Sequence, residues 1–490
     1  MTVSLFDAMN NGTRTTNGMP AFKSTNSAVL DFFSKAGDAR NVDISGYFAK
    51  AMAENQEIAV RTLLWARDVR GGAGERKTFR DLLGTLARNQ DFNHMQGVIE
   101  LTPEVGRWDD LFVLLGTKYE PEVKALIKSA LDAGNGLCAK WMPRQGVIAS
   151  NLRTAFGMSP KQWRKTLVNL TTVVETQMCS KEWNKIDYQK VPSKAIGKYA
   201  KAFGRNDGAR FTAFKTKVEK GEAKINAGAV YPCDVTHLLK RDPSLAEVQW
   251  KALPDYVQGS DERAICVVDV SGSMGTGVGG VGYSQGVSCM DVAISLGIYT
   301  SERLQGVFKN TFITFTDNPK IVKFKEGASL SERVRECQRD VGYSTNLEGV
   351  FDAVLNSAVA NKVPESQMPT KILIISDMQF NAQISGDLSS LAMIQRKYAK
   401  AGYEMPSLVY WNVNAAKYGN SPFTVPQEKV CMVSGFSPAI LTSVLSGKDN
   451  AIDVMLDAIG KERYNYLAKV ATPVAEEVKP KRKYTRKAKV

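Results

Sequence analysis

Residues 264–270 read AICVVDV, and Ser271, Gly272 and Ser273 follow directly; this stretch decides the fold class of the second half of the chain. A short run of β-branched apolar residues predicts a strand buried on both faces, as in a parallel sheet. Similar runs follow at TFITFT (311–316), KILIISD (371–377), SLVYWNV (407–413) and VCMVS (430–434). Helical patterns lie between them at 289–304, 346–360, 387–401 and 437–459. This alternation predicts a doubly wound α/β domain with right-handed crossovers.

Polar side chains follow the first of these strands. Asp269, Ser271 and Ser273 form a D-x-S-x-S pattern at its carboxyl end, which is where doubly wound sheets bind their ligands. One carboxylate and two hydroxyls are hard oxygen donors, and they suit Mg²⁺, Mn²⁺ or Ca²⁺ better than a soft metal. The pattern alone is a weak motif, and two later residues strengthen it.

Thr345 lies in the loop GYSTN (342–346) before a predicted helix, and Asp377 ends the strand KILIIS. In this order and at these strand ends, the five residues resemble the metal-ion-dependent adhesion site of von Willebrand factor A domains. The resemblance covers about residues 261–460 and implies that Asp269, Ser271 and Ser273 bind a divalent cation directly or through water. It gives Thr345 the role of the loop ligand and Asp377 that of a water-mediated carboxylate, with Mg²⁺ the expected cation. The alternative is a degenerate site whose polar residues only cap helices.

Other chemistries find little support in the sequence. A G-x-G-x-x-G pattern at 277–282 does not directly follow a strand, which disfavours a dinucleotide site. Ser273 lacks the G-x-S-x-G context of a hydrolase nucleophile, and His94 and His237 are the only histidines. A Mg²⁺-dependent nuclease would need more carboxylates than Asp269 and Asp377. We therefore expect a protein that is not an enzyme.

Cysteine usage and the absence of targeting signals predict a cytoplasmic location. The seven cysteines are scattered and never form C-x-x-C, which argues against a zinc cluster or a disulfide framework. No apolar run reaches the ~18–20 residues needed to cross a bilayer. The first residues, MTVSLFDAMNNGTRTTNG, lack the basic start and apolar stretch of a signal peptide. We expect reduced thiols and no membrane partner.

The first half of the chain is predicted to be helical. Over residues 45–224, apolar residues recur with helical spacing in NQEIAVRTLLWARDVRGG, TFRDLLGTLARN, WDDLFVLLG and PEVKALIKSALDAGN, and each segment closes near glycine or asparagine. Successive short helices with short loops favour an α-solenoid or an irregular bundle. No fixed period is evident, so a degenerate HEAT-like array is the expectation.

The net charge of +14 is concentrated in two places. Residues 151–224 hold 16 basic and 6 acidic side chains, and residues 471–490 hold 7 and 2, whereas residues 261–470 are nearly neutral. The last segment has the composition of a disordered basic tail, which serves either as a nucleic-acid tether or as a solubilising tail. In 151–224, aromatic residues such as Trp163, Trp183 and Phe203 alternate with the charges. They either stack on RNA bases or form the core beneath a solvated basic face.

A glycine-rich turn stands out at WARDVRGGAGERK (65–77). Its backbone amides, flanked by Arg70, Arg76 and Lys77, are suited to receive a phosphate. It is not a Walker A loop, because no Gly-Lys-Ser/Thr follows at the required spacing. The alternative is a helix–turn–helix connection with a salt-bridge set formed by Arg67, Asp68 and Glu75.

With WARDVRGGAGERK, GRWDDL (106–111), AKWMPRQG (139–146), MCSKEWNKIDYQKVPS (178–193) and KINAGAVYP (224–232), the chain resembles a family of helical-plus-von-Willebrand-A proteins of plants, fungi and phages. That family is similar in layout to the Ro autoantigen, or TROVE-domain, proteins. The resemblance implies a HEAT-like helical ring closed by a von Willebrand A domain, with structured RNA on its basic surface and single-stranded ends in its hole. We expect an N-terminal extension at 1–44, a helical domain at 45–260, a von Willebrand A domain at 261–470 and the tail at 471–490.

The expected function is non-catalytic binding of small or misfolded RNAs in a ribonucleoprotein. The residues expected to contact phosphates are Arg70, Arg76, Lys77, Arg144, Arg153, Lys161, Arg164, Lys165, Lys201, Arg205 and Arg210. The alternative is a protein-interaction scaffold, in which a partner's carboxylate completes the coordination of the cation. The two functions can coexist on different domains.

Overall fold

The computed structural model describes residues 10–471, except 41, 172, 279–285, 317, 340, 341, 343, 344, 381–389, 418 and 426. The predicted tail therefore lies outside the described residues, apart from Ala471. So do Gly279 and Gly282 of the G-x-G-x-x-G pattern and Tyr343 and Ser344 of the GYSTN loop. A helical region is followed by a mixed six-stranded sheet, as the sequence predicted.

The helical region begins after a hairpin of β1 (Gly12–Arg14) and β2 (Pro20–Phe22). Its helices are α2 (Ala28–Ala36), α3 (Ser45–Glu54), α4 (Gln56–Arg67), α5 (Arg76–Arg88), α6 (Met95–Val105), η1 (Trp108–Leu114), α7 (Glu120–Asp132), α8 (Gly136–Trp141), α9 (Val147–Ala155), α10 (Pro160–Leu170), α11 (Val174–Cys179), η2 (Trp183–Lys185), η3 (Tyr188–Lys190), α12 (Ser193–Asn206), α13 (Gly208–Glu219), α14 (Pro232–Leu238) and α15 (Pro243–Lys251).

The sheet region contains β3 (Ala264–Asp269), η4 (Gly272–Gly275), α16 (Cys289–Arg303), η7 (Gly306–Phe308), β4 (Thr311–Phe315), β5 (Ile321–Lys323), α17 (Leu330–Cys337), α18 (Leu347–Asn361), η8 (Glu365–Gln367), β6 (Lys371–Ser376), α19 (Ser390–Lys400), β7 (Ser407–Asn412), β8 (Val430–Ser434), η9 (Pro438–Ile440), α20 (Leu441–Val444), α21 (Ala451–Ile459), η10 (Glu462–Tyr464) and η11 (Ala468–Ala471).

The sheet has the order β5-β4-β3-β6-β7-β8, in which β4 and β5 pair antiparallel and the other neighbours pair parallel. Every residue of β3, β4, β6, β7 and β8 is buried, because both faces of the sheet are covered. The five predicted strands are confirmed. The short strand β5 was not predicted, since its three residues show no buried run.

One predicted helix is divided in the structure. The segment 437–459, which was predicted to be helical, forms η9, α20 and α21. Gly447 adopts a φ of +80°, which ends the helical path, and the side chain of Asn450 then caps α21 by accepting from the amide of Asp453. The segment is thus helical as predicted, with an interruption between α20 and α21.

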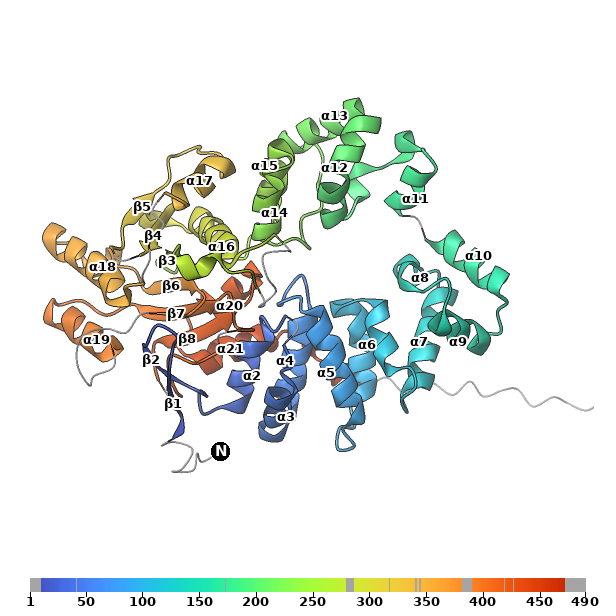
Figure 1. Ribbon diagram of the computed structural model, residues 1–490, viewed down its shortest axis with the longest axis horizontal. Helices are drawn as coiled ribbons and strands as arrows, with labels where there is room; N and C mark the ends of the chain where they lie inside the picture. The colour runs from blue at the N-terminus through green and yellow to red at the C-terminus, as the bar shows by residue number, and fades with distance from the viewer. Residues whose placement is uncertain are drawn as a thin grey trace, which may run out of the picture.

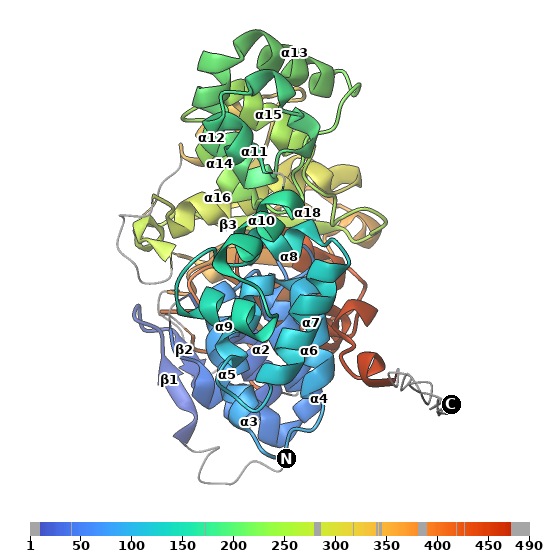
Figure 2. The ribbon, with the colours of Figure 1, turned by 90° about the vertical axis from the view of Figure 1, so that its right-hand side faces the viewer.

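The helices follow an arc whose two ends both pack on the sheet region (Figure 1). At the start, α2 contacts β8 and α21, and α4 contacts α21; at the end, α14 contacts α16 and α17. Figure 2 shows the arc from the side, with α12 and α13 at one end of the molecule and α2, α3 and α4 at the other. The first contact is close, because a Cβ at Gly37 after α2 would overlap Ser434 of β8. The helical arc and the sheet region of one chain thus form a closed ring of packed elements.

Candidate functional site

The five predicted cation ligands meet at the carboxyl edge of the sheet. Asp269 is the last residue of β3, and Asp377 follows β6, the parallel neighbour of β3. Ser271 and Ser273 lie where the chain leaves β3 and enters η4. The chain passes from β3 to β4 and β5 on one side of β3 and then crosses to β6 on the other side, so this is the point where a doubly wound sheet opens a crevice.

Hydrogen bonds hold these side chains in place. The amide of Ser271 donates to Oδ1 of Asp269 at 2.9 Å, and the hydroxyl of Ser376 donates to Oδ2 at 2.5 Å. The Oγ atoms of Ser271 and Ser273 lie 3.2 Å apart. Asp377 receives a hydrogen bond from the amide of Gln379 on Oδ1 at 3.1 Å. Its Oδ2 is buried and accepts no such bond within the described part of the chain.

The site contains two carboxyl groups that are buried away from water. Asp269 is fully buried, Asp377 is 1% exposed, and Ser271 and Thr345 are nearly as buried. Burial, together with the charge of Asp377, raises the pKa of Asp269 to about 7. Burial also raises the pKa of Asp377, and the hydrogen bond from the amide of Gln379 partly offsets this rise. A cation between the two carboxylates would relieve both effects.

The donor chemistry decides which ion would fit. Among the described residues, no three His, Cys, Asp or Glu side chains come together as a metal cluster. Hydroxyl oxygens must therefore supply much of any coordination, and Oδ2 of Asp377 is a buried acceptor without a hydrogen-bond partner. This donor set fits a hard cation such as Mg²⁺ and does not fit zinc or copper.

The N-terminal hairpin reaches this edge of the sheet, which the sequence gave no reason to expect. The hydroxyl of Thr15 donates to the carbonyl of Phe380 at 2.8 Å, and the amide of Thr16 donates to Oε1 of Gln379 at 2.8 Å. The backbone carbonyl of Gln379 accepts from the side-chain amide of Asn17 at 2.6 Å and from the hydroxyl of Thr345 at 3.5 Å. The hairpin thus supports the loop that carries Asp377. No sequence signal connects segments more than 360 residues apart.

The predicted phosphate contacts are spread over the helical arc. Most are exposed, namely Arg70, Arg76, Lys77, Arg144, Lys161, Arg164, Lys165, Lys201, Arg205 and Arg210, whereas Arg153 is half-buried. They fall near the turn after α4, in the connection between α8 and α9 (Arg144), on α9 and α10, and on α12 and α13. Arg210 is held by the carbonyls of Trp183 and Ile186, at 2.9 and 2.8 Å, and therefore has a structural role.

The aromatic residues of 151–224 belong mainly to the core. Trp163 is 1% exposed, and Phe203 and Phe211 are 0% and 2% exposed. Tyr188 packs its ring against Phe203, Phe211 and Phe214. Of the two readings of this segment, the structure supports a solvated basic face above an aromatic core, so these rings do not stack on bases.

The glycine-rich turn is used for packing. The amides of Gly72, Ala73 and Glu75 donate to carbonyls within residues 65–68, and the amide of Arg70 donates to the carboxylate of Asp68. Gly74 has a φ of +79°, and a Cβ there would overlap the hydroxyl of Tyr231. These amides are not available to a phosphate.

The charged residues that were expected to form salt bridges with one another in this turn pair with other residues. Arg67 pairs with Asp110 at 2.7 Å, and Asp68 accepts from Tyr464 at 2.9 Å and from Arg463 at 2.7 Å. The turn therefore joins the helical region to the end of the sheet region, and the predicted set of Arg67, Asp68 and Glu75 was wrong.

Comparisons with known proteins agree with this two-part organisation. Residues 263–485 match the family described as "Domain of unknown function (DUF7788)", and residues 15–94 and 143–263 match "Domain of unknown function (DUF2828)". The chain is 29% identical to "Uncharacterized protein L728" of Acanthamoeba polyphaga mimivirus, over 91% of this chain and 86% of that protein.

A solved structure shares the arrangement. The crystal structure of the Deinococcus radiodurans Ro (RSR) protein superposes with a TM-score of 0.51 at 14% identity, over 89% of this chain and 100% of that one. At this identity the likeness is one of fold. The expectation of a Ro-like layout is thereby confirmed. Among the described residues, no helix has the length and apolar character needed to cross a membrane.

Proposed function

We propose that this protein is a non-catalytic RNA-binding protein of Ro type, which binds small structured or misfolded RNAs and their single-stranded ends. The observation that carries the proposal is the Ro-like fold combined with the placement of charge. Residues 151–224 carry 16 basic against 6 acidic side chains, while residues 261–470 carry 20 against 21. The helical arc is therefore the part of the molecule that attracts phosphates.

The buried aromatic core determines the mode of binding. Because the rings of Trp163, Phe203 and Phe211 are enclosed, the helical surface offers charge rather than stacking platforms. Contacts of this kind go to phosphates and carry little sequence information. We therefore expect affinity for many RNAs, with strong dependence on salt.

Fluorescence anisotropy with a labelled small RNA tests the proposal. If roughly six phosphate contacts form, the affinity falls by about 10³ between 50 and 200 mM salt. Replacing Arg164 and Lys165 on α10 by glutamate is expected to weaken binding. The matched control replaces Lys323 and Lys325, two exposed lysines of the sheet region, by glutamate, and it should bind like wild type. An affinity that stays constant across salt concentrations, or no binding at 50 mM, contradicts the proposal.

A second function is supported by the acid–hydroxyl cluster at the sheet edge. We propose that Asp269, Ser271, Ser273, Thr345 and Asp377 bind a divalent cation, most fittingly Mg²⁺, in the manner of a von Willebrand A domain. The strand order and the position of the cluster at the crevice support this assignment. Such a cation keeps an open position, which a partner's carboxylate can fill. Two carboxylates are too few for a nuclease-type two-metal centre, in keeping with a binding role.

Pull-downs with and without chelator test the scaffold function. Asp269→Ala is expected to abolish capture of a metal-dependent partner and to leave RNA retention intact. Loss of RNA binding in this variant, with the fold preserved, would assign the cluster to RNA instead. We place the protein in the cytoplasm, where its seven cysteines stay reduced; fractionation of expressing cells tests this location.

A further inference from the structure

Helix α12 carries its basic residues on one face. Lys194, Lys198, Lys201 and Arg205 follow one another at spacings of four, three and four, which places them in a single row on a helix of 3.6 residues per turn. All four are exposed, whereas Ile196, Ala200 and Phe203 on the other side are buried. With a rise of ~1.5 Å per residue, the row is about 16 Å long.

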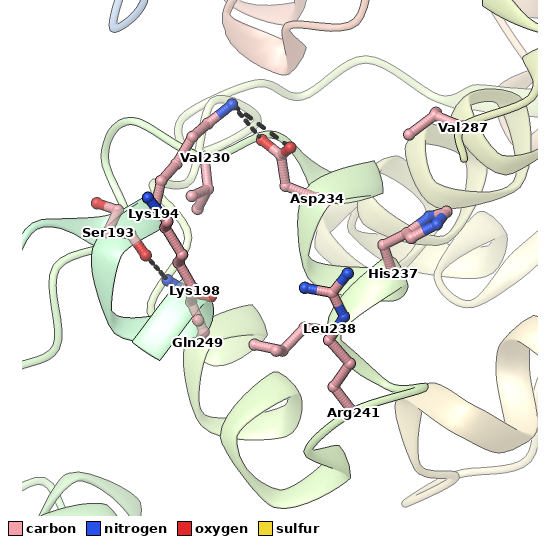
Figure 3. Close-up of a pocket in the computed structure, with 11 residues that line it drawn as sticks. Ser193, Lys194, Lys198, Val230, Asp234, His237, Leu238, Arg241, Gln249 and Val287 are labelled. Atoms are coloured by element: carbon pink, nitrogen blue, oxygen red, sulfur yellow. Dashed lines mark hydrogen bonds and ion pairs between the residues drawn. The ribbon is translucent and has the colours of Figure 1, made fainter. Parts of the chain in front are cut away.

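Two adjoining cavities run along this row. The first, of about 240 Å³, lies between α12 and α14 and is lined by Lys194, Lys198, His237 and Arg241 among others (Figure 3). The second, of about 460 Å³, continues along α12 and is lined by Lys198, Lys201 and Arg241. Gly197, Lys198 and Arg241 line both cavities, so the two form one continuous depression. We call it the α12 groove.

The α12 groove has an excess of positive charge. Its two acidic side chains already have partners: Asp234 pairs with Lys194 at 3.0 Å, as Figure 3 shows, and Asp242 lies 3.4 Å from Lys215 and caps α15. Within the described part of the chain, no ion pair engages the other basic residues of the groove and its end, which are Lys198, Lys201, Arg205 and Arg241. Like charges three and four residues apart destabilise a free helix, so this row costs stability unless an anion lies against it.

The side of α12 that faces the groove is also unusually open. Gly197 and Gly204 both line the groove, although glycine is unfavourable inside a helix. The fold does not require them: a Cβ at Gly204 would meet nothing within 4 Å, and one at Gly197 would make only ordinary contacts at 3.6 Å with Leu238. Residues without side chains let a ligand approach the helix backbone closely.

We propose that the α12 groove holds the sugar–phosphate backbone of single-stranded RNA. This inference rests on the proposed RNA-binding function and deepens it by naming the site and the form of the strand. A basic groove that follows the backbone is the usual way to bind single strands without sequence preference.

The chemistry at each end of the groove agrees with this occupant. The side chain of Arg241 projects into the cavity between α12 and α14 and can form two parallel hydrogen bonds to one phosphate (Figure 3). Lys198 and Lys201 act as point charges for the next phosphates along the row. Tyr199 donates its hydroxyl to Glu175 at 3.2 Å, so it contributes to packing rather than to base recognition.

A charge-reversal experiment tests the groove. The groove variant carries Lys198→Glu and Lys201→Glu, and the control carries Lys217→Glu and Lys220→Glu, which make the same change in charge on exposed positions of α13 and its end. The probes are a labelled oligouridine of about 12 nucleotides, within the ~4–16 nucleotides typical of such grooves, and a fully paired RNA hairpin with a minimal loop. Anisotropy is measured for both probes over a series of salt concentrations.

Relative to the control, the groove variant is expected to lose at least about tenfold in affinity for the single strand. The steepness of the plot of log K against log salt concentration should also decrease by about 1.4, since each of the two lost phosphate contacts accounts for ~0.7. Affinity for the hairpin should change equally in variant and control. Equal single-strand affinity in the two variants, or an equal loss for both probes, overturns the assignment and leaves the proposed function standing. Absence of RNA binding by the wild type overturns the proposed function itself. If the glutamates prevent folding, Lys198→Ala with Lys201→Ala replaces them, and the same slope change decides.

Discussion

Replacing Asp269 by asparagine tests the candidate cation site through two measurements, the stability without a cation and the response to Mg²⁺. Asparagine has nearly the same shape, and its Oδ1 can keep the 2.9 Å hydrogen bond from the amide of Ser271. Its amide group would face the hydroxyl of Ser376, which can accept as well as donate. The substitution therefore removes one of two buried negative charges and leaves the packing in place.

The magnitude follows from the burial of this carboxyl. Burial and the charge of Asp377 raise the pKa of Asp269 from 3.8 to about 7. Since the pKa is raised in the folded state, the cation-free wild type loses stability as the pH rises from about 4 to about 7. At ~1.4 kcal/mol per pKa unit, about three units correspond to roughly 4 kcal/mol above pH 7. The neutral variant avoids this cost and should be more stable than the cation-free wild type at pH 8.

Addition of Mg²⁺ should narrow this difference in stability, because it stabilises mainly the wild type. A cation present at about 100 times its Kd stabilises the wild type by ~2.7 kcal/mol, whereas the variant, which lacks a ligand charge, gains little. Urea unfolding with chelator and with Mg²⁺, at pH 5.5 and pH 8, measures both differences. Asp352→Asn on α18 is the control, because it makes the same charge change away from the cluster. A variant that keeps the full response to Mg²⁺, or that is less stable than wild type at pH 8 in chelator, refutes the reasoning.

Three further predictions concern buried polar contacts in and around the glycine-rich turn of the helical region. Asp110→Ala leaves the 4%-exposed Arg67 without its partner and should lower the free energy of unfolding by ~3–5 kcal/mol in urea titrations, and a loss under 1 kcal/mol would contradict this. Burial raises the pKa of the Glu75 carboxyl to about 7, so the wild type should lose roughly 3 kcal/mol of stability between about pH 4.5 and 7. Glu75→Gln removes this carboxyl, and the variant should keep that stability. A pH profile of stability that is the same in variant and wild type contradicts the raised pKa. Tyr231→Phe deletes the 2.7 Å hydrogen bond to the carbonyl of Ala73 and should cost ~1–3 kcal/mol, with faster amide exchange in the glycine-rich turn as the local readout.

The sequence was most informative where the structure depends on local pattern. The strands β3, β4, β6, β7 and β8 were visible because a parallel strand buried on both faces needs an unbroken apolar run. The position of the polar cluster followed from the same rule, since parallel strands bring their carboxyl ends to one edge. The hairpin β1–β2 and strand β5 are too short to leave such a pattern.

The structure alone decided between alternatives that composition leaves open. Basic and aromatic residues alternate in 151–224 whether the rings face solvent or core, and only packing shows that Phe203 and Phe211 are enclosed. The glycine-rich turn looks open to phosphate in sequence, yet its amides are satisfied within residues 65–68. A turn's hydrogen bonds depend on the backbone path, which its residue types do not specify.

By itself, the sequence determined that the second half is an α/β sheet with oxygen donors at one edge, and that the net positive charge lies in the helical half and in residues 471–490. Tertiary structure decided that both ends of the helical arc pack on the sheet region, that the N-terminal hairpin supports the Asp377 loop, and that α12 and α14 enclose a basic groove. The physical reason is the difference in sequence separation between the contacts involved. Periodicity reports on neighbours within a few residues, whereas a groove or a closed arc arises from contacts between segments tens to hundreds of residues apart.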